Sequence, residues 1–241
     1  MRTTTLTRVS NTLCSSLYNL TDIAKDIKPN NILVNWHRNV DKGIVVEQVQ
    51  LTDLEDACFM PPDAAIVGLQ PGNWMWRSPE AHAQGPCSES TDMFSFGLVV
   101  SFGESSCAMG SLVQGVTNVE QCIYALTKRV VLAVDESELE EGEELLSHVL
   151  ARQISYFADA DGLAGLLNRL QGSPWVEVFE ILRDDFGESN PRKPFALWKR
   201  DDCDQEDWSN FKTLVEGLTR FDPDRRMTAE EALNHSWFRD A

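Results

Sequence analysis

Apolar positions recur at helical spacing along most of the chain. The predicted helices cover residues 10–24, Met93–Phe102, 145–170, Val176–Leu182, Phe211–Arg220 and Thr228–Trp237. Met93–Phe102 is apolar almost throughout, which predicts a buried helix with its cap near Thr91 or Asp92. The last helix opens on Thr228 with Glu231 three residues later, the pattern of a capping box. The pattern therefore predicts a mainly α fold.

A shorter part of the sequence favours β-structure. Ile32–Val34 and Val45–Leu51 are rich in β-branched residues, and a polar stretch with Gly43 separates them, so we expect an antiparallel hairpin. Residues 56–75 carry several prolines and glycines and predict an extended loop. Residues 183–207 are mostly polar and predict a connection on the surface. The fold expected is thus helical with a small hairpin near its start.

Composition narrows the classes of partner. Hydrophobic residues make up 42% of the 241 positions, enough for a buried core. The formal net charge of −17 argues against binding nucleic acid or an anionic membrane, because both need a basic surface. No apolar run is long enough to span a bilayer. The charge is compatible with basic peptides or proteins as substrates or partners.

The six cysteines and four histidines are scattered along the chain. No two cysteines form a closely spaced pair, so we expect neither a disulfide framework nor a zinc site. This cysteine usage suits a reducing compartment. We therefore expect an intracellular protein, cytoplasmic or nuclear.

Two polar motifs flank the predicted hairpin. The run Asp-Ile-Lys-Pro-Asn-Asn occupies residues 26–31, immediately before the first strand. The run Thr-Asp-Leu-Glu-Asp occupies residues 52–56, at the end of the second strand. A loop with the spacing of Asp26 and Asn31 can place a carboxylate beside an attacking hydroxyl and an amide oxygen on a metal ion.

Two further motifs lie later in the chain. Ser-Pro-Glu occupies residues 78–80, and Asp92 follows twelve residues later at the start of the central apolar helix. Phe-Asp-Pro-Asp-Arg-Arg-Met-Thr-Ala occupies residues 221–229, before a helix that ends in Trp-Phe. Each motif alone is a weak indication of function. All four motifs in this order along one chain are a strong indication.

In this order the four motifs resemble the C-terminal lobe of eukaryotic-type protein kinases of the Ser/Thr class, across residues 24–238. The sequences of residues 53–56 and 75–80 are similar to those of divergent fungal kinase-like proteins. The resemblance implies transfer of the ATP γ-phosphoryl group to a Ser or Thr hydroxyl. It implies that Asp26 accepts the hydroxyl proton and that Lys28 supports the phosphoryl charge. Asn31 and Asp53 would hold Mg²⁺ and thereby the nucleotide.

The resemblance also assigns structural residues. Glu80 and Arg226 are implied to form a buried ion pair, and Asp92 is implied to anchor the backbone of the catalytic loop. These three residues would hold the lobe together rather than touch substrate.

Several positions depart from the kinase pattern. Only 25 residues precede Asp26, so we expect the ATP-gripping N-terminal lobe to be missing. Glu55 stands where glycine is usual, and Asn73 replaces a threonine that commonly bridges the catalytic Asp and Lys. Residues 54–77 contain no Ser, Thr or Tyr, so switching by phosphorylation of this loop is not expected.

The domain organisation expected is a single kinase-like domain over residues 1–241, with an enlarged insertion over residues 103–210. Residues 105–122 show no clear pattern. The functions that remain open are an active protein kinase, a catalytically dead pseudokinase that serves as an interaction module, and a fragment of a longer kinase.

Overall fold

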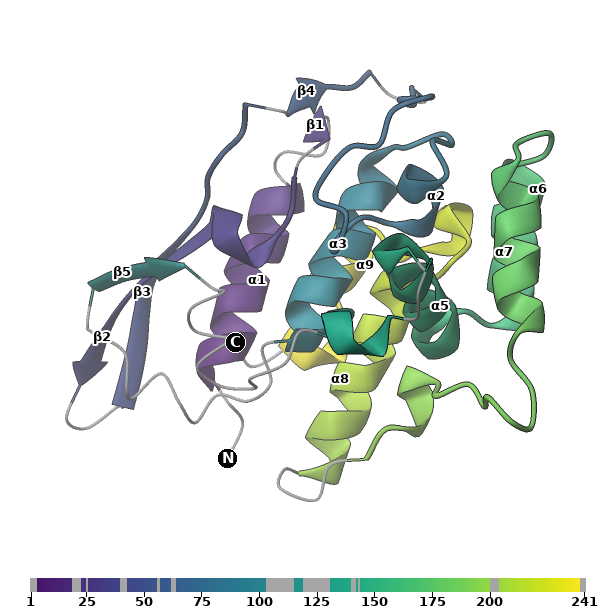
Figure 1. The fold of residues 1–241 in the computed structure, drawn as a ribbon. Helices are drawn as coiled ribbons and strands as arrows, with labels where there is room; N and C mark the ends of the chain where they lie inside the picture. The colour runs from purple at the N-terminus through teal and green to yellow at the C-terminus, as the bar shows by residue number, and fades with distance from the viewer. Residues whose placement is uncertain are drawn as a thin grey trace.

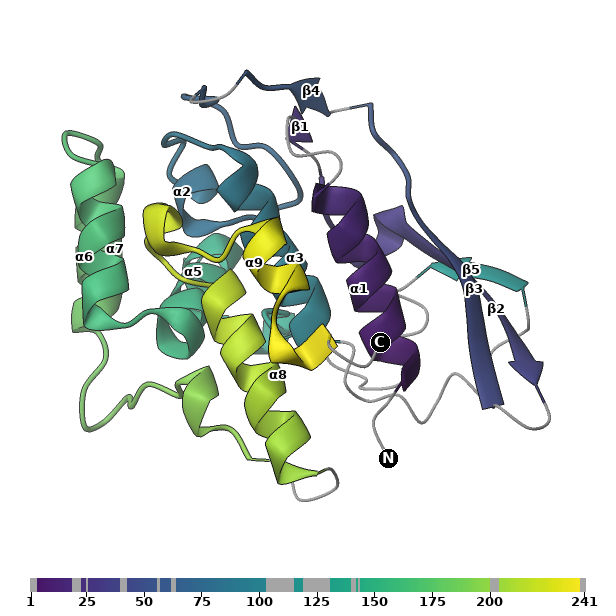
Figure 2. The ribbon, with the colours of Figure 1, turned by 180° about the vertical axis from the view of Figure 1, so that it is seen from behind.

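The structure is a computed structural model that describes residues 4–18, 23–24, 26–39, 43–55, 57–61, 64–102, 115–118, 131–139, 142, 144–199 and 204–238. An antiparallel sheet lies at one side of the molecule, a group of helices lies in the middle, and α6 and α7 lie at the opposite side (Figure 1). Figure 2 shows the same order of layers from behind. The predicted mainly α architecture with a small β-hairpin is confirmed.

Helix α3 (Glu89–Phe102) is the centre of the core. Every residue from 91 to 100 is buried, as expected for a helix that is apolar on all sides. The helix begins at Glu89, two to three residues before the cap that we predicted at Thr91 or Asp92. Thr91 lies inside the helix, and its hydroxyl donates a hydrogen bond to the Glu80 carboxylate at 3.1 Å.

The predicted hairpin is formed by β2 (Ile32–Asn39) and β3 (Gly43–Leu51). The strands are antiparallel, with Ile32 opposite Leu51 and a shift of register between Asn35 and Trp36. Strand β5 (Gly115–Asn118) adds a third strand on the other edge of β2, so the order is β3–β2–β5. We did not predict β5, because its stretch of sequence has no clear apolar alternation.

Helix α1 (Thr4–Tyr18) packs against β3 and α9. Our prediction of a helix over residues 10–24 was therefore wrong at both ends. The buried positions Val9, Leu13 and Leu17 follow helical spacing, but Ser and Thr residues around them weaken the pattern. Ile23–Ala24, which the prediction included, forms strand β1 and pairs with β4 (Cys58–Phe59).

Three helices in the second half of the chain share a smaller hydrophobic cluster. They are α5 (Leu145–Phe157), α6 (Ala160–Arg169) and α7 (Trp175–Asp184). α5 and α6 together replace the single helical region predicted over residues 145–170. The break falls at Asp159, whose side chain caps α6 by accepting from the amide of Gly162. These helices and η3 (Glu136–Glu138) lie within the insertion expected over residues 103–210.

The segment predicted as a polar connection over residues 183–207 also contributes to the core. It contains the short helix η4 (Phe195–Leu197), and Phe195 is buried among the rings of Phe157, Trp198 and Phe211. The apolar run from Phe195 to Trp198 is too short to give a periodic signal, so the sequence pattern missed it.

Helix α8 (Gln205–Leu218) packs along α3 and starts six residues before the predicted Phe211. Asp204 caps it by accepting from two backbone amides, those of Glu206 and Asp207. The close approach of the two helices depends on Gly97. A Cβ at that position would lie 2.8 Å from Leu218 Cβ and 2.8 Å from Thr219 Cγ2.

The chain ends in η5 (Pro223–Arg225), α9 (Ala229–Leu233) and η6 (Ser236–Phe238). The predicted capping box is confirmed, because Thr228 and Glu231 exchange side-chain to backbone hydrogen bonds. The predicted helix over Thr228–Trp237 is divided in two by a turn at Asn234. η1 (Pro29–Asn31) and α2 (Pro79–His82) carry residues of the candidate site.

Candidate active site

The loop of residues 26–31 is fixed to the core by its apolar members. Ile27 is almost completely buried, and Pro29 opens the short helix η1, where its missing N–H leaves no donor unpaired. Asp26 and Lys28, on either side of Ile27, keep partly exposed side chains. The sequence thus anchors the loop at alternate positions and leaves two charged groups at its surface.

Both carboxylate oxygens of Asp26 have partners. Oδ2 lies 2.5 Å from the Lys28 ammonium, and Oδ1 accepts a hydrogen bond from the backbone amide of Asn73 at 2.8 Å. Asn73 comes from a loop 47 positions away. These two contacts fix the orientation of the carboxylate.

Asn31 joins this loop to the end of strand β3. Its side-chain Nδ2 donates to the backbone carbonyl of Asp26 at 3.0 Å. Its own backbone carbonyl accepts from Thr52, from the amide at 2.7 Å and from the hydroxyl at 3.1 Å. The residue after Thr52 is Asp53, so these bonds bring the second polar motif beside the first.

Asp53 has a left-handed backbone conformation, with φ of 59°. Aspartate tolerates this region better than most residues, and such conformations concentrate at functional sites. Its carboxylate Oδ2 lies 4.0 Å from Lys28 Nζ, and half of the side chain is exposed. Lys28 therefore stands between the carboxylates of Asp26 and Asp53. Glu55, which replaces the usual glycine, is exposed.

The structure thus brings Asp26, Lys28, Asn31 and Asp53 into one place. Their catalytic and metal-binding roles remain predictions. Thr52 and Arg77 also contribute to this site, and sequence reasoning did not single them out. A signal for Thr52 exists, since it is the residue before Asp53. Arg77 gave no signal, because its side chain donates to the backbone carbonyls of Pro71 and Gly72.

Asn73 acts differently from what we expected of a residue that replaces a bridging threonine. Its side-chain Oδ1 accepts from the backbone amide of Met75 at 3.0 Å. Its contact with Asp26 is made by the main chain instead. An asparagine favours local turn contacts of this kind, so the side chain caps its own loop.

The residues predicted to be structural are all buried. Glu80, in α2, and Arg226 form the expected ion pair, with two hydrogen bonds of 2.7 and 3.0 Å. Burial opposes the charge of Glu80, but the guanidinium of Arg226 outweighs it and holds the pKa of Glu80 below its ordinary value. Asp92 is buried in the first turn of α3, next to Thr91.

Two basic side chains near the site are perturbed by burial. Burial lowers the pKa of Arg77, and the negative charge of Asp26 opposes this shift. Burial, together with the positive charge of Arg77, lowers the pKa of His82 to about 3. His82 is therefore neutral at physiological pH, and its backbone carbonyl accepts a hydrogen bond from Gln70 Nε2 at 2.7 Å.

The oxygen donors of Asn31 and Asp53 suit Mg²⁺, which is commonly held by one or two carboxylates together with substrate phosphates. The hydrogen bond of Asn31 uses its Nδ2, so the amide oxygen stays available as a ligand. Asp53 is exposed enough to leave room for phosphate oxygens. Within the described part of the chain, no group of three or more His, Cys, Asp or Glu residues forms a metal site of protein ligands alone.

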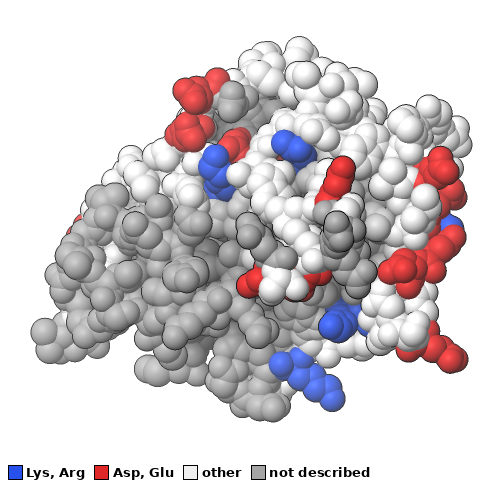
Figure 3. Space-filling model, in the orientation of Figure 1, with Lys and Arg blue, Asp and Glu red and all other residues white. Residues whose placement is uncertain are grey.

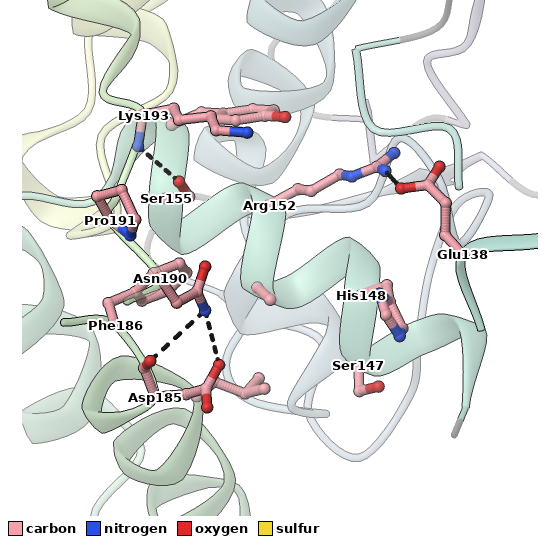
Figure 4. A pocket seen from close by; sticks show the side chains of 13 residues that line it. Glu138, Ser147, His148, Arg152, Ser155, Asp185, Phe186, Asn190, Pro191 and Lys193 are labelled. Atoms are coloured by element: carbon pink, nitrogen blue, oxygen red, sulfur yellow. Dashed lines mark hydrogen bonds and ion pairs between the residues drawn. The ribbon is translucent and has the colours of Figure 1, made fainter. Parts of the chain in front are cut away.

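A separate hollow of about 400 Å³ lies between α5 and the segment after α7 (Figure 4). At its rim Arg152 pairs with Glu138 at 2.5 Å, and Asn190 donates to Asp185 at 2.9 Å. The four candidate residues do not line this hollow. Of the helices that the structure describes, none combines the length and the apolar character needed to cross a membrane.

Comparison with known sequences shows the family of the chain. The family described as protein kinase domain matches residues 12–238. The chain therefore belongs to the protein kinase family, whose members use ATP and a divalent metal ion. It is also similar to the dual specificity protein kinase KNS1 of Saccharomyces cerevisiae, with 30% identity over 89 residues. The match covers 26% of this chain and 12% of that kinase, so it spans only a small part of the relative's length.

Proposed function

We propose that this chain carries the phosphoryl-transfer centre of a protein kinase, with ATP as the donor and a Ser or Thr hydroxyl of a protein as the acceptor. The observation that carries the proposal is the position of Lys28 Nζ, which lies 2.5 Å from the Asp26 carboxylate and 4.0 Å from that of Asp53. A catalytic carboxylate, a phosphate-binding cation and a metal-binding carboxylate are the groups that this reaction needs.

In the proposed reaction, the acceptor hydroxyl oxygen forms a bond to the γ-phosphorus while the bond from that phosphorus to the β–γ bridging oxygen breaks. Asp26 accepts the hydroxyl proton, and ADP leaves with the bridging oxygen. Lys28 turns from the two carboxylates toward the transferring group and stabilises its negative charge. Asn73 holds Asp26 Oδ1, so the carboxylate is oriented before substrate arrives.

Asn31 and Asp53 would hold Mg²⁺ through an amide oxygen and a carboxylate. When bound, the ion would neutralise negative charge on the phosphate oxygens. The hydrogen bonds between Thr52 and the Asn31 carbonyl keep these two ligands side by side.

Lys28, two residues after Asp26, supports Ser and Thr as acceptors, since this is the pattern of that class of kinases. The relative KNS1 is named a dual specificity kinase, so the acceptor residue has to be measured. The acidic surface supports a basic protein as substrate. Acidic side chains gather over α7 at the right-hand edge in Figure 3, and Glu177, Glu180 and Asp184 are exposed there.

The test is transfer of radiolabelled γ-phosphate from ATP to a basic protein such as a histone, with Mg²⁺ and the full chain. We expect transfer that is lost in Asp26→Asn, strongly reduced in Asp53→Asn, and kept in the control Asp161→Asn on the exposed surface of α6. Hydrolysis of the product should release phosphoserine or phosphothreonine. Transfer that survives Asp26→Ala or Asp53→Ala overturns the site, and phosphotyrosine as the main product overturns the acceptor class.

A second candidate is a non-catalytic interaction module, and one observation favours it. The segment after Asp53 exposes four large apolar side chains, to 46, 71, 65 and 62%. They are Leu54, Phe59, Val67 and Leu69. Exposed apolar surface of this kind is typical of sites for protein partners.

Absence of phosphate transfer and of Mg²⁺-dependent ATP binding would favour this second candidate. A dye that binds apolar surface, such as 8-anilinonaphthalene-1-sulfonate, then reports on the segment. We expect Leu69→Ser to reduce dye binding more than Ile181→Ser, which replaces an equally exposed residue on α7. Equal reduction by both changes would contradict a special role for this segment.

A further inference from the structure

The peptide unit between Gly72 and Asn73 connects two charged side chains. Its carbonyl oxygen, on Gly72, accepts a hydrogen bond from Arg77 Nη2 at 2.6 Å. Its N–H, on Asn73, donates to Asp26 Oδ1 at 2.8 Å. A peptide unit is planar and rigid, so the position of its carbonyl determines the direction of its N–H. In a trans peptide the two groups point in opposite directions.

Hydrogen bonds between residues of the same segment hold the backbone around this peptide in place. Arg77 Nε also donates to the carbonyl of Pro71 at 2.9 Å, and the Arg77 amide donates to the carbonyl of Asn73 at 2.9 Å. Gly72 has a φ of 80°, which a residue with a side chain rarely adopts, and a Cβ there would lie 3.5 Å from Asp26 Oδ1. The planar guanidinium thus fixes two successive carbonyls, a geometry that an ammonium cannot reproduce.

We propose that Arg77 is a positioning residue for Asp26, which it orients through the Gly72–Asn73 peptide. Its positive charge polarises the carbonyl and thereby strengthens the donor N–H at the other end of the peptide. The proposal rests on the function proposed above, in which Asp26 accepts the hydroxyl proton.

The two oxygens of Asp26 are thereby divided between two cations. Lys28 contacts Oδ2 directly, whereas Arg77 acts on Oδ1 through one peptide unit. When Lys28 turns to the phosphoryl group, the contact of Oδ1 remains. Arg77 thus keeps the carboxylate oriented at the stage at which its direct partner leaves.

Three variants test the proposal. Arg77→Gln removes the charge and the fork, Arg77→Lys keeps the charge alone, and Gln153→Met is the control. Gln153 Nε2 donates to the backbone carbonyl of Arg77 at 2.9 Å, so its loss loosens the same segment without touching the guanidinium. Thermal unfolding of each variant shows that it is folded.

The first readout is hydrogen exchange of the Asn73 amide, measured by NMR on the full chain. We expect Arg77→Gln to speed this exchange by about tenfold or more, Arg77→Lys to have an intermediate effect, and Gln153→Met to change it by less than about threefold. An unchanged exchange rate in both Arg77 variants overturns the proposal. So does an equal change in Gln153→Met, because Arg77 would then only hold the segment together.

The second readout is the split between kcat and KM. Misplacement of a catalytic group lowers the rate with little effect on binding, so Arg77→Gln should lower kcat by about tenfold to hundredfold and leave KM for ATP within about twofold. If the unchanged chain transfers no phosphate, the proposed function fails, and the amide exchange still decides the contact. If the chain is active and kcat is insensitive to Arg77→Gln, the positioning role alone fails.

Discussion

Glu80 and Arg226 lie 146 positions apart in the sequence and form a two-point ion pair in which neither side chain is exposed to solvent. Two further N–H groups of the guanidinium donate to the carbonyls of Ser90 and Arg220, and its Cζ lies 5.0 Å from the centre of the Phe94 ring. The pair therefore ties α2, α3 and the segment before α9 together.

We expect removal of one partner of this pair to be strongly destabilising. Glu80→Ala or Arg226→Ala would leave an uncompensated buried charge, which costs about 3–5 kcal/mol of unfolding free energy. The measurement is urea unfolding followed by circular dichroism.

The matched control for the ion pair is Asp224→Ala, which breaks the exposed pair of Asp224 with Arg169. Exposed pairs contribute little, so this change should cost less than about 1 kcal/mol. If the Glu80 and Asp224 variants lost equal stability, burial of the first pair would not be the reason for its importance.

His82 should make stability fall as pH is lowered from 6.5 toward 3. Its pKa is lowered to about 3 in the folded chain and is 6.5 when unperturbed, so between these values the unfolded state binds a proton that the folded state does not. The unfolding free energy therefore decreases with falling pH, by at most about 1.4 kcal/mol per pH unit for this group.

Glu80 contributes in the same direction but at lower pH, because its lowered pKa matters only below its ordinary value of 4.5. Between pH 6.5 and 4.5 Glu80 thus adds nothing to the slope, whereas Glu216, whose pKa burial raises above 4.5, opposes the slope of His82. The measurement is urea unfolding at several pH values, and His82→Gln should flatten the slope in this window. The same slope before and after the change would contradict a buried, neutral His82, and His37→Gln, at a half-exposed position, serves as the control.

Gly97→Ala should destabilise the contact between α3 and α8. The added methyl would lie 2.8 Å from atoms of Leu218 and Thr219, so the helices would have to move apart. Overpacking of this kind costs about 1–3 kcal/mol, measurable as a lower melting temperature. Gly187→Ala is the control, since a Cβ at that position has no atom within 4 Å. A melting temperature unchanged by Gly97→Ala would show that the helices separate without cost.

The cysteines of the described part should differ in reactivity. Burial raises the pKa of Cys14 and of Cys87 to about 12, whereas Cys58 is exposed in strand β4. Because the thiolate is the reactive form, iodoacetamide at pH 8 should modify Cys58 before Cys14 and Cys87. Peptide mass spectrometry should show modification of Cys14 and Cys87 only after unfolding. Early modification of either would mean that α1 or the segment around Cys87 opens readily.

The sequence predicted the structure correctly where neighbouring residues alone determine it. The capping box of Thr228 and Glu231 and the hairpin from Ile32 to Leu51 could be predicted because their signals are local. The order of motifs pointed to Glu80 and Arg226, although nothing in their neighbourhoods showed that they meet.

Contacts made by the main chain could not be predicted. The bond from the Asn73 amide to Asp26 and the bonds from Arg77 to carbonyls depend on backbone direction, which side-chain identity does not encode. Strand β5 and the buried Phe195 were missed for a related reason, since each depends on a distant surface that exists only after folding.

The pairing of β5 with β2 limits which residues can be deleted from this protein. β2 begins at the residue after Asn31, and β5 covers the edge that β3 does not. A shortened version without residues 103–130 would lack β5, and the free edge of β2 would be exposed to water or to another chain. Removal of this stretch would therefore disturb the strand that directly follows the loop where the chemistry is proposed to occur.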